Sequence, residues 1–168
     1  MRTRRLEQVR LEGLKSQTLE VLLAQHPFFK TLKPDQLRFL AGCASNLRFK
    51  PGEFLYREEA EANDFFVIRE GKVAIETFSP KRGAITIQTL TSGDVLGWSW
   101  LFPPYHAHFA ARVIEPTRLL RFDGKCLRKK CDEDHDLGYE LLRRFSEVMI
   151  QRLQATRLQL LDIYGEGG

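Results

Sequence analysis

The sequence lacks the long apolar run that a membrane-spanning helix requires. No part of its 168 residues approaches the roughly 18 apolar residues in succession that cross a bilayer. The amino-terminal Met-Arg-Thr-Arg-Arg is basic, but the hydrophobic segment of a signal peptide does not follow it. We therefore expect a cytoplasmic protein that makes no membrane contact.

Cysteine is scarce, with three residues in the chain. A small, odd number argues against a disulfide scaffold and fits a reducing compartment. Cys43 lies on the apolar side of a helical pattern, so we expect a buried small hydrophobe there. Cys126, Cys131 and His135 have metal-ligand chemistry, but their spacing is irregular and a fourth ligand is missing. We expect no metal site.

Signatures of catalysis are also missing. We find no nucleophile with a base and an orienting group, no paired carboxylates in a cleft-like context and no Walker-type loop. Ser99 stands between two tryptophans and lacks the G-x-S-x-G frame of a hydrolase. We expect no catalytic residues and no enzymatic activity.

The excess of one charge sign is small, with a formal net charge of +4. The basic residues are spread along the whole chain, which is typical of a solvated, mildly basic surface and not of a nucleic-acid patch. An apolar fraction of 43% is that of an ordinary globular protein, and 168 residues suffice for one domain.

Helical patterns open the chain. Leucine and valine recur at helical spacing over residues 3–25, and Pro27 ends that segment. Pro34 opens a second, short helix that ends near Gly42. From residue 47 to residue 122 the period changes to short apolar runs separated by turn signals, with a hairpin across residues 80–83. This region predicts a compact all-β sandwich, roll or barrel.

The last part of the chain predicts a long helix. Residues 124–130 read as a short basic turn, and the four carboxylates within residues 131–136 suit a helix start. Over residues 137–164 a seam close to the roughly 3.5-residue spacing of a coiled coil consists of Leu142, Met149, Leu153, Thr156, Leu160 and Ile163. The residues beside the seam, which we expect to face the β structure, are Leu141, Phe145, Val148 and Leu158.

The stretch from Thr91 to Val113 organises the chain. Gly93-Asp94 marks a turn, and Val95-Leu96 marks a buried strand end. Gly97 is a second break, with room for about one helical turn before Pro103-Pro104. Unpaired N–H groups at such a helix start can hold an anion. The crowded aromatic residues here either pack the core under a loop or form the walls of a pocket.

Several of these motifs, in their order, resemble the cyclic nucleotide-binding domain family. Gly93-Asp94-Val95-Leu96-Gly97, followed by Phe109-Ala110-Ala111-Arg112-Val113, looks like the phosphate-binding cassette of that family. Residues 26–37 resemble the family's opening helices, and residues 49–55 and 66–73 resemble its first strands. The resemblance covers about residues 27–164.

Two residues that bind the cyclic nucleotide in the family are replaced by other residue types in this chain. In the family, a glutamate directly after the second cassette glycine holds the ribose hydroxyl, and here that residue is Trp98. The slot of the arginine that neutralises the cyclic phosphate falls within residues 106–109, and none of them is arginine. The ligand would be a cyclic nucleotide or another small anion. The candidate ligand-binding residues are Gly97, Trp98, Ser99, Trp100, Leu101, His106, His108, Phe109, Ala110 and Arg112.

The resemblance implies an α+β, mainly β fold. An antiparallel, jelly-roll-like β-roll over about 47–122 would be flanked by N-terminal helices and one long C-terminal helix over about 133–164. Residues 1–25 would form an N-terminal helix, and residues 26–164 the cyclic nucleotide-binding-like domain. In the family the matching C-terminal helix joins two protomers, so we expect a homodimer through Leu142, Met149, Leu153 and Leu160.

Three functions remain open at this stage. The chain is either a small-ligand sensor that does not bind cAMP or cGMP in the standard way, or a ligand-free module that binds a protein partner with its pocket filled. In the third possibility it is the sensor part of a transcription regulator. Nothing after Ile163 resembles a helix-turn-helix, so we expect no DNA-binding domain and no specific DNA binding by this chain.

Overall fold

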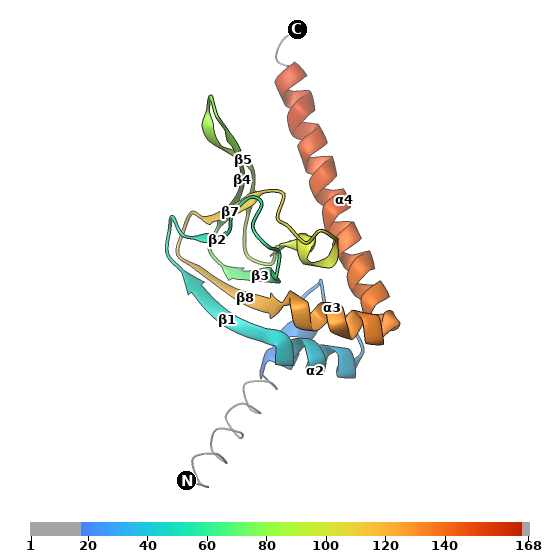
Figure 1. Cartoon of the computed structure of the whole chain (residues 1–168). Coiled ribbons are helices and arrows are strands. Elements are labelled where there is room, and N and C mark those ends of the chain that lie inside the picture. Colours follow the sequence, from blue (N-terminus) through green and yellow to red (C-terminus); the bar gives the residue numbers. More distant parts are fainter. Residues whose placement is uncertain (1–17, 166–168) are drawn as a thin grey trace.

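The computed structural model describes residues 18–165 (Figure 1). Residues 18–25 are helical, as the sequence predicts, and the rest of the helix expected over 3–25 lies outside the described residues. Helix α2 (Pro34–Cys43) follows, with Pro34 in its first turn. The helices within 18–165 include none that combines the length and the apolarity needed to cross a membrane.

Two antiparallel sheets form the expected β-roll. One has the strand order β1-β8-β3-β6, and the other has the order β2-β7-β4-β5. The hairpin of β4 and β5 turns where the sequence places it and projects away from the roll (Figure 1). The strands are β1 (Ala44–Phe49), β2 (Phe54–Tyr56), β3 (Asp64–Glu70), β4 (Val73–Ser79), β5 (Gly83–Leu90), β6 (Val95–Leu96), β7 (Ala110–Val113) and β8 (Thr117–Asp123).

Strand β3 separates two apolar cores, because successive side chains of a strand point to opposite faces. Phe66 and Ile68 belong to the core between the two sheets. Phe65 and Val67 belong to the core between the roll and the helices. There the ring of Phe65 stacks on that of Phe122, with centroids 4.4 Å apart. The roll therefore has a packed inner face and a second apolar face that the helices cover.

Helix α3 (Gly124–Glu133) corrects the expectation of a short basic turn over 124–130. In the sequence, Gly124 looks like a residue that ends the preceding strand. In the structure a glycine is required there because the chain packs closely: a Cβ would lie 2.7 Å from Asn63 O. The Asp123 carboxylate accepts the Cys126 N–H at 3.0 Å and caps the helix. Helix α4 (His135–Gly165) is a separate helix, and the Asp134 carboxylate accepts the Leu137 N–H at 3.1 Å at its start.

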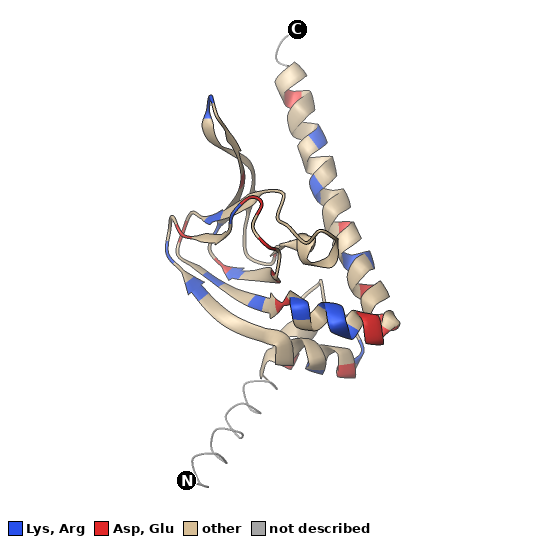
Figure 2. Ribbon diagram, in the orientation of Figure 1, with Lys and Arg blue, Asp and Glu red and all other residues tan. Residues whose placement is uncertain are grey.

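Lysine and arginine gather on α3, while elsewhere both charge signs are spread over strands and helices (Figure 2). The basic residues of α3 are Lys125, Arg128, Lys129 and Lys130. Arg128 is used structurally, because its Nη1 donates to Trp100 O at 2.7 Å. Its guanidinium also lies 4.3 Å from the centroid of the Tyr105 ring. Helix α3 thus supports the segment that follows β6.

Helix α4 packs on the roll with its first half and extends past it with its second half (Figure 1). Leu141 and Phe145 are fully buried against the roll, as the sequence predicts, and Val148 packs beside them. The expectation for Leu158 is wrong, because its side chain is 63% exposed. At residue 158 the helix extends beyond the roll. Helical periodicity therefore predicts which side of the helix a residue lies on, but not whether the roll reaches far enough to cover it.

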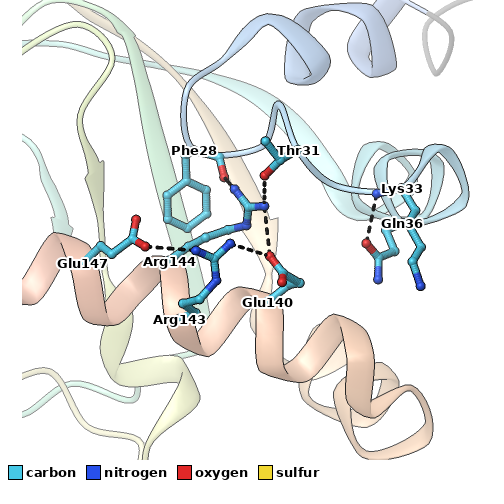
Figure 3. Close-up of polar contacts among 8 residues, drawn as sticks. All are labelled: Phe28, Thr31, Lys33, Gln36, Glu140, Arg143, Arg144 and Glu147. Carbon is cyan, nitrogen blue, oxygen red and sulfur yellow. Dashed lines mark hydrogen bonds and ion pairs between the residues drawn. The ribbon is translucent and has the colours of Figure 1, made fainter.

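A buried arginine fastens α4 to the segment between the first helix and α2 (Figure 3). Arg144 donates from Nη1 to Phe28 O at 2.6 Å and from Nη2 to Thr31 Oγ1 at 2.5 Å. Nη2 also donates to Glu140 Oε2 at 3.1 Å, one helical turn back along α4. One guanidinium therefore satisfies polar groups from two segments that are distant in sequence.

His26 gives this same segment a pH dependence. Its Nε2 donates to Gly93 O at 3.0 Å, and its Nδ1 accepts the Phe28 N–H at 3.1 Å. This pair of bonds requires the neutral ring, because protonation of Nδ1 would set two donors against each other. Burial lowers the pKa of His26, and the bond to Gly93 opposes part of that change.

We expect acid to weaken the fold through His26. The unfolded chain takes up the proton at the ordinary histidine pKa of 6.5, above the pKa in the folded state. The stabilisation is therefore complete above that value and is lost as the pH falls below it toward the folded pKa. Urea unfolding at pH 7.5 and 5.5 should show this loss, and His26→Gln should reduce it, whereas His108→Gln should not. An equal loss in the His26→Gln protein would contradict the assignment.

Candidate ligand-binding site

The site begins at Gly97, directly after β6. Gly97 has a φ of 89°, in the left-handed region that favours glycine. A Cβ at this position would lie 3.0 Å from Asp64 O and 3.3 Å from Phe65 Cα, so β3 also requires the glycine. One turn of 3-10 helix, η1 (Trp98–Leu101), follows, as the sequence predicts. The backbone thus turns sharply away from the sheet at the edge of a hollow.

A pocket of about 600 Å³, counting the part open to solvent, lies beside this turn. Its walls come from residues 55–56, 61–64, 97–99 and 107–109, from Phe66 and Ile75, and from Arg152. Strands from both sheets therefore meet the turn after β6 and one residue of α4 at this point. The pocket combines aromatic and aliphatic walls with a few polar groups, which is the usual make-up of a small-molecule site.

Half of the candidate ligand-binding residues line this pocket. They are Gly97, Trp98, Ser99, His108 and Phe109. Trp98 and Phe109 bring aromatic surface from opposite halves of the cassette, on the two sides of the Pro103-Pro104 break. The interpretation of the aromatic cluster as pocket wall therefore holds for these two residues.

The other candidates lie elsewhere. Trp100 is fully buried in the core under the roll, where its ring stacks on Phe65 with centroids 5.5 Å apart. Leu101 packs against that same core, so for these two residues the interpretation as core packing holds. His106 forms a backbone bridge with Glu61. The remaining two candidates, Ala110 and Arg112, lie in β7.

Arg112 is bound to a carboxylate of the neighbouring strand. Its Nε donates to both oxygens of Glu76, at 3.1 and 3.0 Å, and its Nη2 donates to Oε1 at 2.5 Å. Glu76 is 3% exposed. The hydrogen bond to Glu76, and then the charge of that carboxylate, raise the pKa of Arg112. A buried carboxylate needs this partner, so Arg112 serves the sheet and does not line the pocket.

Sequence analysis missed the arginine that does line the pocket. Arg152 of α4 places its guanidinium carbon 4.9 Å from the centroid of the Trp98 ring. Its Nη2 makes a close contact with Val95 O. Burial lowers the pKa of Arg152, while the nearby Tyr56 and Asp94 act in the opposite direction. Among the lining residues of the described part of the chain, Arg152 is the one lysine or arginine.

Helical spacing contains a signal that points to Arg152. Phe145 and Val148 lie on the face of α4 that packs on the roll, and the next position on that face is 152. An arginine that continues an apolar stripe toward the protein needs a partner there. Which partner it meets depends on how the helix crosses the roll, and no local pattern gives that.

Tyr56 brings a second hydroxyl group to the pocket, beside that of Ser99. Burial raises its pKa to about 12, and the charge of Arg152 acts against this rise. The phenol therefore stays protonated at neutral pH and can donate a hydrogen bond into the pocket. Its ring stacks on Phe66, with centroids 6.1 Å apart, which fixes its position.

A β-roll that holds such a pocket against a long helix defines a small-ligand sensor domain. The model of the cyclic nucleotide-binding domain matches residues 46–134, more than half of the chain. The chain belongs to the cyclic nucleotide-binding domain family.

Relatives agree with this assignment. The CRP-like cAMP-activated global transcriptional regulator of Mycobacterium tuberculosis is 23% identical over 145 residues, which is 86% of this chain and 63% of that protein. A cyclic nucleotide-binding domain from Methylobacillus flagellatus has a TM-score of 0.72 at 16% identity, covering 88% of this chain and 83% of that one. The sensor domain of the transcriptional regulator DNR from Pseudomonas aeruginosa has a TM-score of 0.65 at 21% identity, covering 83% and 93%. The two structures share the fold, and the chain spans less than two thirds of the Mycobacterium regulator.

Proposed function

We propose that this chain is a regulatory module that binds a small ligand in the pocket beside η1 and passes the ligand state to α4. The observation that carries the proposal is that Arg152, a residue of the long helix, is part of the pocket wall. A ligand in the pocket contacts the helix directly, so binding and helix position are coupled without an intermediate element. The ligand-sensing class of the fold supports the same function.

The pocket residues do not fit the usual contacts of cAMP or cGMP. The residue after Gly97 is Trp98, and its ring lies under the Arg152 guanidinium where the family has a ribose-binding carboxylate. Residues 106–109 include no arginine for the cyclic phosphate. Arg112, the nearest arginine along the chain, is held by Glu76. The ligand of this module is therefore a different small molecule.

We expect cAMP and cGMP to bind at least tenfold, and up to about a thousandfold, more weakly than to a cassette with both contacts. Losing one partner of a buried charge pair costs about 2–5 kcal/mol, and each 1.4 kcal/mol is about tenfold in affinity. Calorimetry with both nucleotides measures this directly. Micromolar or tighter binding would refute the prediction, and Arg112→Ala and Arg152→Gln would then show which cation replaces the missing one.

A thermal-shift screen of nucleotides and small anionic metabolites tests the sensor function. A ligand should raise the melting temperature of the protein, and Trp98→Ala should abolish the shift because Trp98 lines the pocket. Phe78→Ala is the matched control, since Phe78 is an aromatic residue 69% exposed on the projecting hairpin. A shift that survives Trp98→Ala would place the ligand elsewhere.

One observation favours a second candidate, a ligand-free interaction module. The Arg152 guanidinium over Trp98 already occupies part of the pocket, as a filled site would require. The interaction module would be the function if no compound in the thermal-shift screen raises the melting temperature and a protein partner is found whose binding is lost when α4 is altered.

The link to transcription is a separate proposal. The chain aligns with 63% of a transcriptional regulator, which supports the sensor part of such a regulator as its role. By itself this chain should not bind a defined DNA site, although its basic residues can give weak, salt-sensitive retention. A footprint of this chain on one DNA sequence would contradict that expectation.

A further inference from the structure

We infer that Arg152 is the anion-recognising residue of the pocket, and that the ligand is a small carboxylate or phosphate ester with a flat apolar group. This inference rests on the proposed function and names its ligand class. It also assigns the cation that the cassette itself lacks to a residue of α4.

The first support is that no carboxylate of the described residues is paired directly with Arg152, and the nearby Asp94 acts on it through its charge alone. Within residues 18–165 it forms no ion pair with a carboxylate, in contrast to Arg112 and Arg144. Its contacts are Val95 O and the face of Trp98. A guanidinium carries several N–H donors arranged to match a carboxylate or phosphate, and here most of them are unused. A half-buried cation that has no ion-pair partner is favourably placed to accept an anion.

The second support is the charge of the other lining residues. The pocket contains two carboxylates, Asp64 and Glu61. Asp64 lies 3.0 Å from Arg121 Nε, which neutralises it. Glu61 accepts a hydrogen bond from Asn63 at 3.1 Å and is held near the surface. Among the charged lining residues of the described chain, Arg152 is therefore the one that is half-buried and has no ion-pair partner.

The shape of the walls sets the rest of the ligand. Trp98, Phe66 and Phe109 present ring surfaces to the pocket, and Leu55 and Ile75 add aliphatic surface. Flat groups stack on such walls, and the Tyr56 hydroxyl can donate one further hydrogen bond. An anion on a flat apolar body uses all these features together.

The position of Arg152 also gives the coupling to the helix. It precedes Leu153, a residue of the seam expected to form the dimer contact. An anion would compete with Val95 O for the guanidinium and draw Arg152 out of its present contacts. That movement would be transmitted to the seam through the adjacent residue of the same helix.

The test uses two anionic probes, phenyl phosphate and benzoate, and a neutral probe, benzyl alcohol. Binding is followed by calorimetry and by the fluorescence of the two tryptophans, one of which lines the pocket. We expect the anionic probes to bind at least tenfold more tightly than benzyl alcohol. Arg152→Gln should remove this preference, whereas Arg157→Gln, a matched change at an exposed arginine of the same helix, should keep it.

The outcomes separate this inference from the proposed function. Equal binding of neutral and anionic probes, or an unchanged preference in Arg152→Gln, would overturn the anion assignment and leave the sensor function standing. If none of the probes and no compound of the metabolite screen binds, both the anion assignment and the sensor function are overturned. The circular dichroism spectrum of Arg152→Gln shows whether the variant is folded. If it is not, Arg152→Lys provides the test, because a lysine keeps the charge but loses the fork of donors.

A different observation carries a second inference: we propose that Cys43 and Cys126 form a reversible disulfide under hydroperoxide oxidation. Their sulfur atoms lie 3.4 Å apart, at the end of α2 and in the first turn of α3. A disulfide requires a separation of about 2.05 Å, so a small shift of the two helices suffices. Cys126 is exposed and accessible to the oxidant, whereas Cys43 is half-buried.

The chemistry assigns distinct roles to the two thiols. Cys126, as the thiolate, attacks a hydroperoxide, and the O–O bond breaks to give a sulfenic acid and an alcohol or water. Cys43 then attacks the sulfenic sulfur, the S–S bond forms and water leaves, so two thiols are oxidised as one hydroperoxide is reduced. Burial raises the pKa of Cys43 to about 12, which makes it the slower, resolving thiol.

Thiol counting tests this pair. Hydrogen peroxide should reduce the free thiols from three to one, lower the intact mass by about two hydrogens and raise the melting temperature by roughly 5–10 °C. Dithiothreitol should reverse all three changes. Cys131→Ser should still form the bond, while Cys43→Ser and Cys126→Ser should not. Peroxide treatment that adds oxygen to the monomer, links two chains or leaves all thiols free would overturn the proposal.

Discussion

Arg144→Leu should lower the free energy of unfolding by about 2–4 kcal/mol, which corresponds to a fall of roughly 5–15 °C in melting temperature. Arg144 is 5% exposed, and its guanidinium is the hydrogen-bond donor to Phe28 O and Thr31 Oγ1. Leucine preserves much of the packing volume but leaves the buried Phe28 carbonyl without a partner, whereas Thr31 is exposed and water can replace its lost bond. The unmet desolvation cost of the Phe28 carbonyl dominates, because the hydrophobic gain of leucine is local and small.

Arg143→Leu provides the matched control (Figure 3). Arg143 stands next to Arg144 on α4 and pairs with Glu140 at 3.0 Å and Glu147 at 3.2 Å, but on the solvent side. The Arg143 hydrogen bond is the largest influence that lowers the pKa of Glu140, ahead of the charge of Arg144. Exposed pairs contribute little to stability, so the melting temperature should hardly change. We call the Arg144 hydrogen bonds to Phe28 and Thr31 the clamp. An equal loss of stability in both variants would mean that the clamp does not stabilise the fold.

The clamp also bears on function. It holds α4 to the segment of residues 26–32, and His26 of that segment bonds to Gly93 at the start of the cassette. The base of the long helix is therefore fixed, while its second half extends beyond the roll. Under the proposed function, a change at Arg152 would be transmitted to the free half of α4, because the hydrogen bonds of Arg144 hold the other half in place.

The fold was predictable from the sequence where the signals are local. Gly97 and Gly93 each mark a turn with positive φ, and the hairpin over residues 80–83 follows from alternation on both sides of it. The long C-terminal helix followed from its apolar seam, and the choice of an antiparallel roll followed from the family resemblance. Helix α3 was missed because Gly124 has two possible meanings, a stop signal or a close contact. Only the position of Asn63, far along the chain, distinguishes them.

The pocket was predictable only in part, for a related reason. The cassette residues 97–99, 108 and 109 are near one another in sequence and were identified, whereas Ala107 was not. Trp98 and Trp100 look alike in sequence, yet one lines the pocket and the other is buried in the core, because η1 turns them to different sides. Arg152 is distant in sequence, and only the crossing of α4 over the roll brings it to the site.

The largest expected change in assembly is that Leu153→Glu converts a homodimer into a monomer. We propose the dimer from the apolar seam on α4, where Leu153 is 51% exposed, Leu160 49% and Ile163 70% in the single chain. Covering the seam with a second copy would remove several hundred square ångströms of apolar surface from water, at about 25 cal/mol per Å². A glutamate in that interface would be buried without a partner, which weakens association by far more than tenfold.

Light scattering at micromolar concentration should give a dimer mass for the unchanged chain and a monomer mass for Leu153→Glu. The roll should stay folded, because Leu153 lies beyond both apolar cores. Gln154→Glu is the matched control: it adds the same charge one residue along, on a different side of the helix, and should leave the dimer intact. A monomer mass for the unchanged chain would refute the dimer. Equal weakening by both substitutions would show that the contact is electrostatic and not the apolar seam.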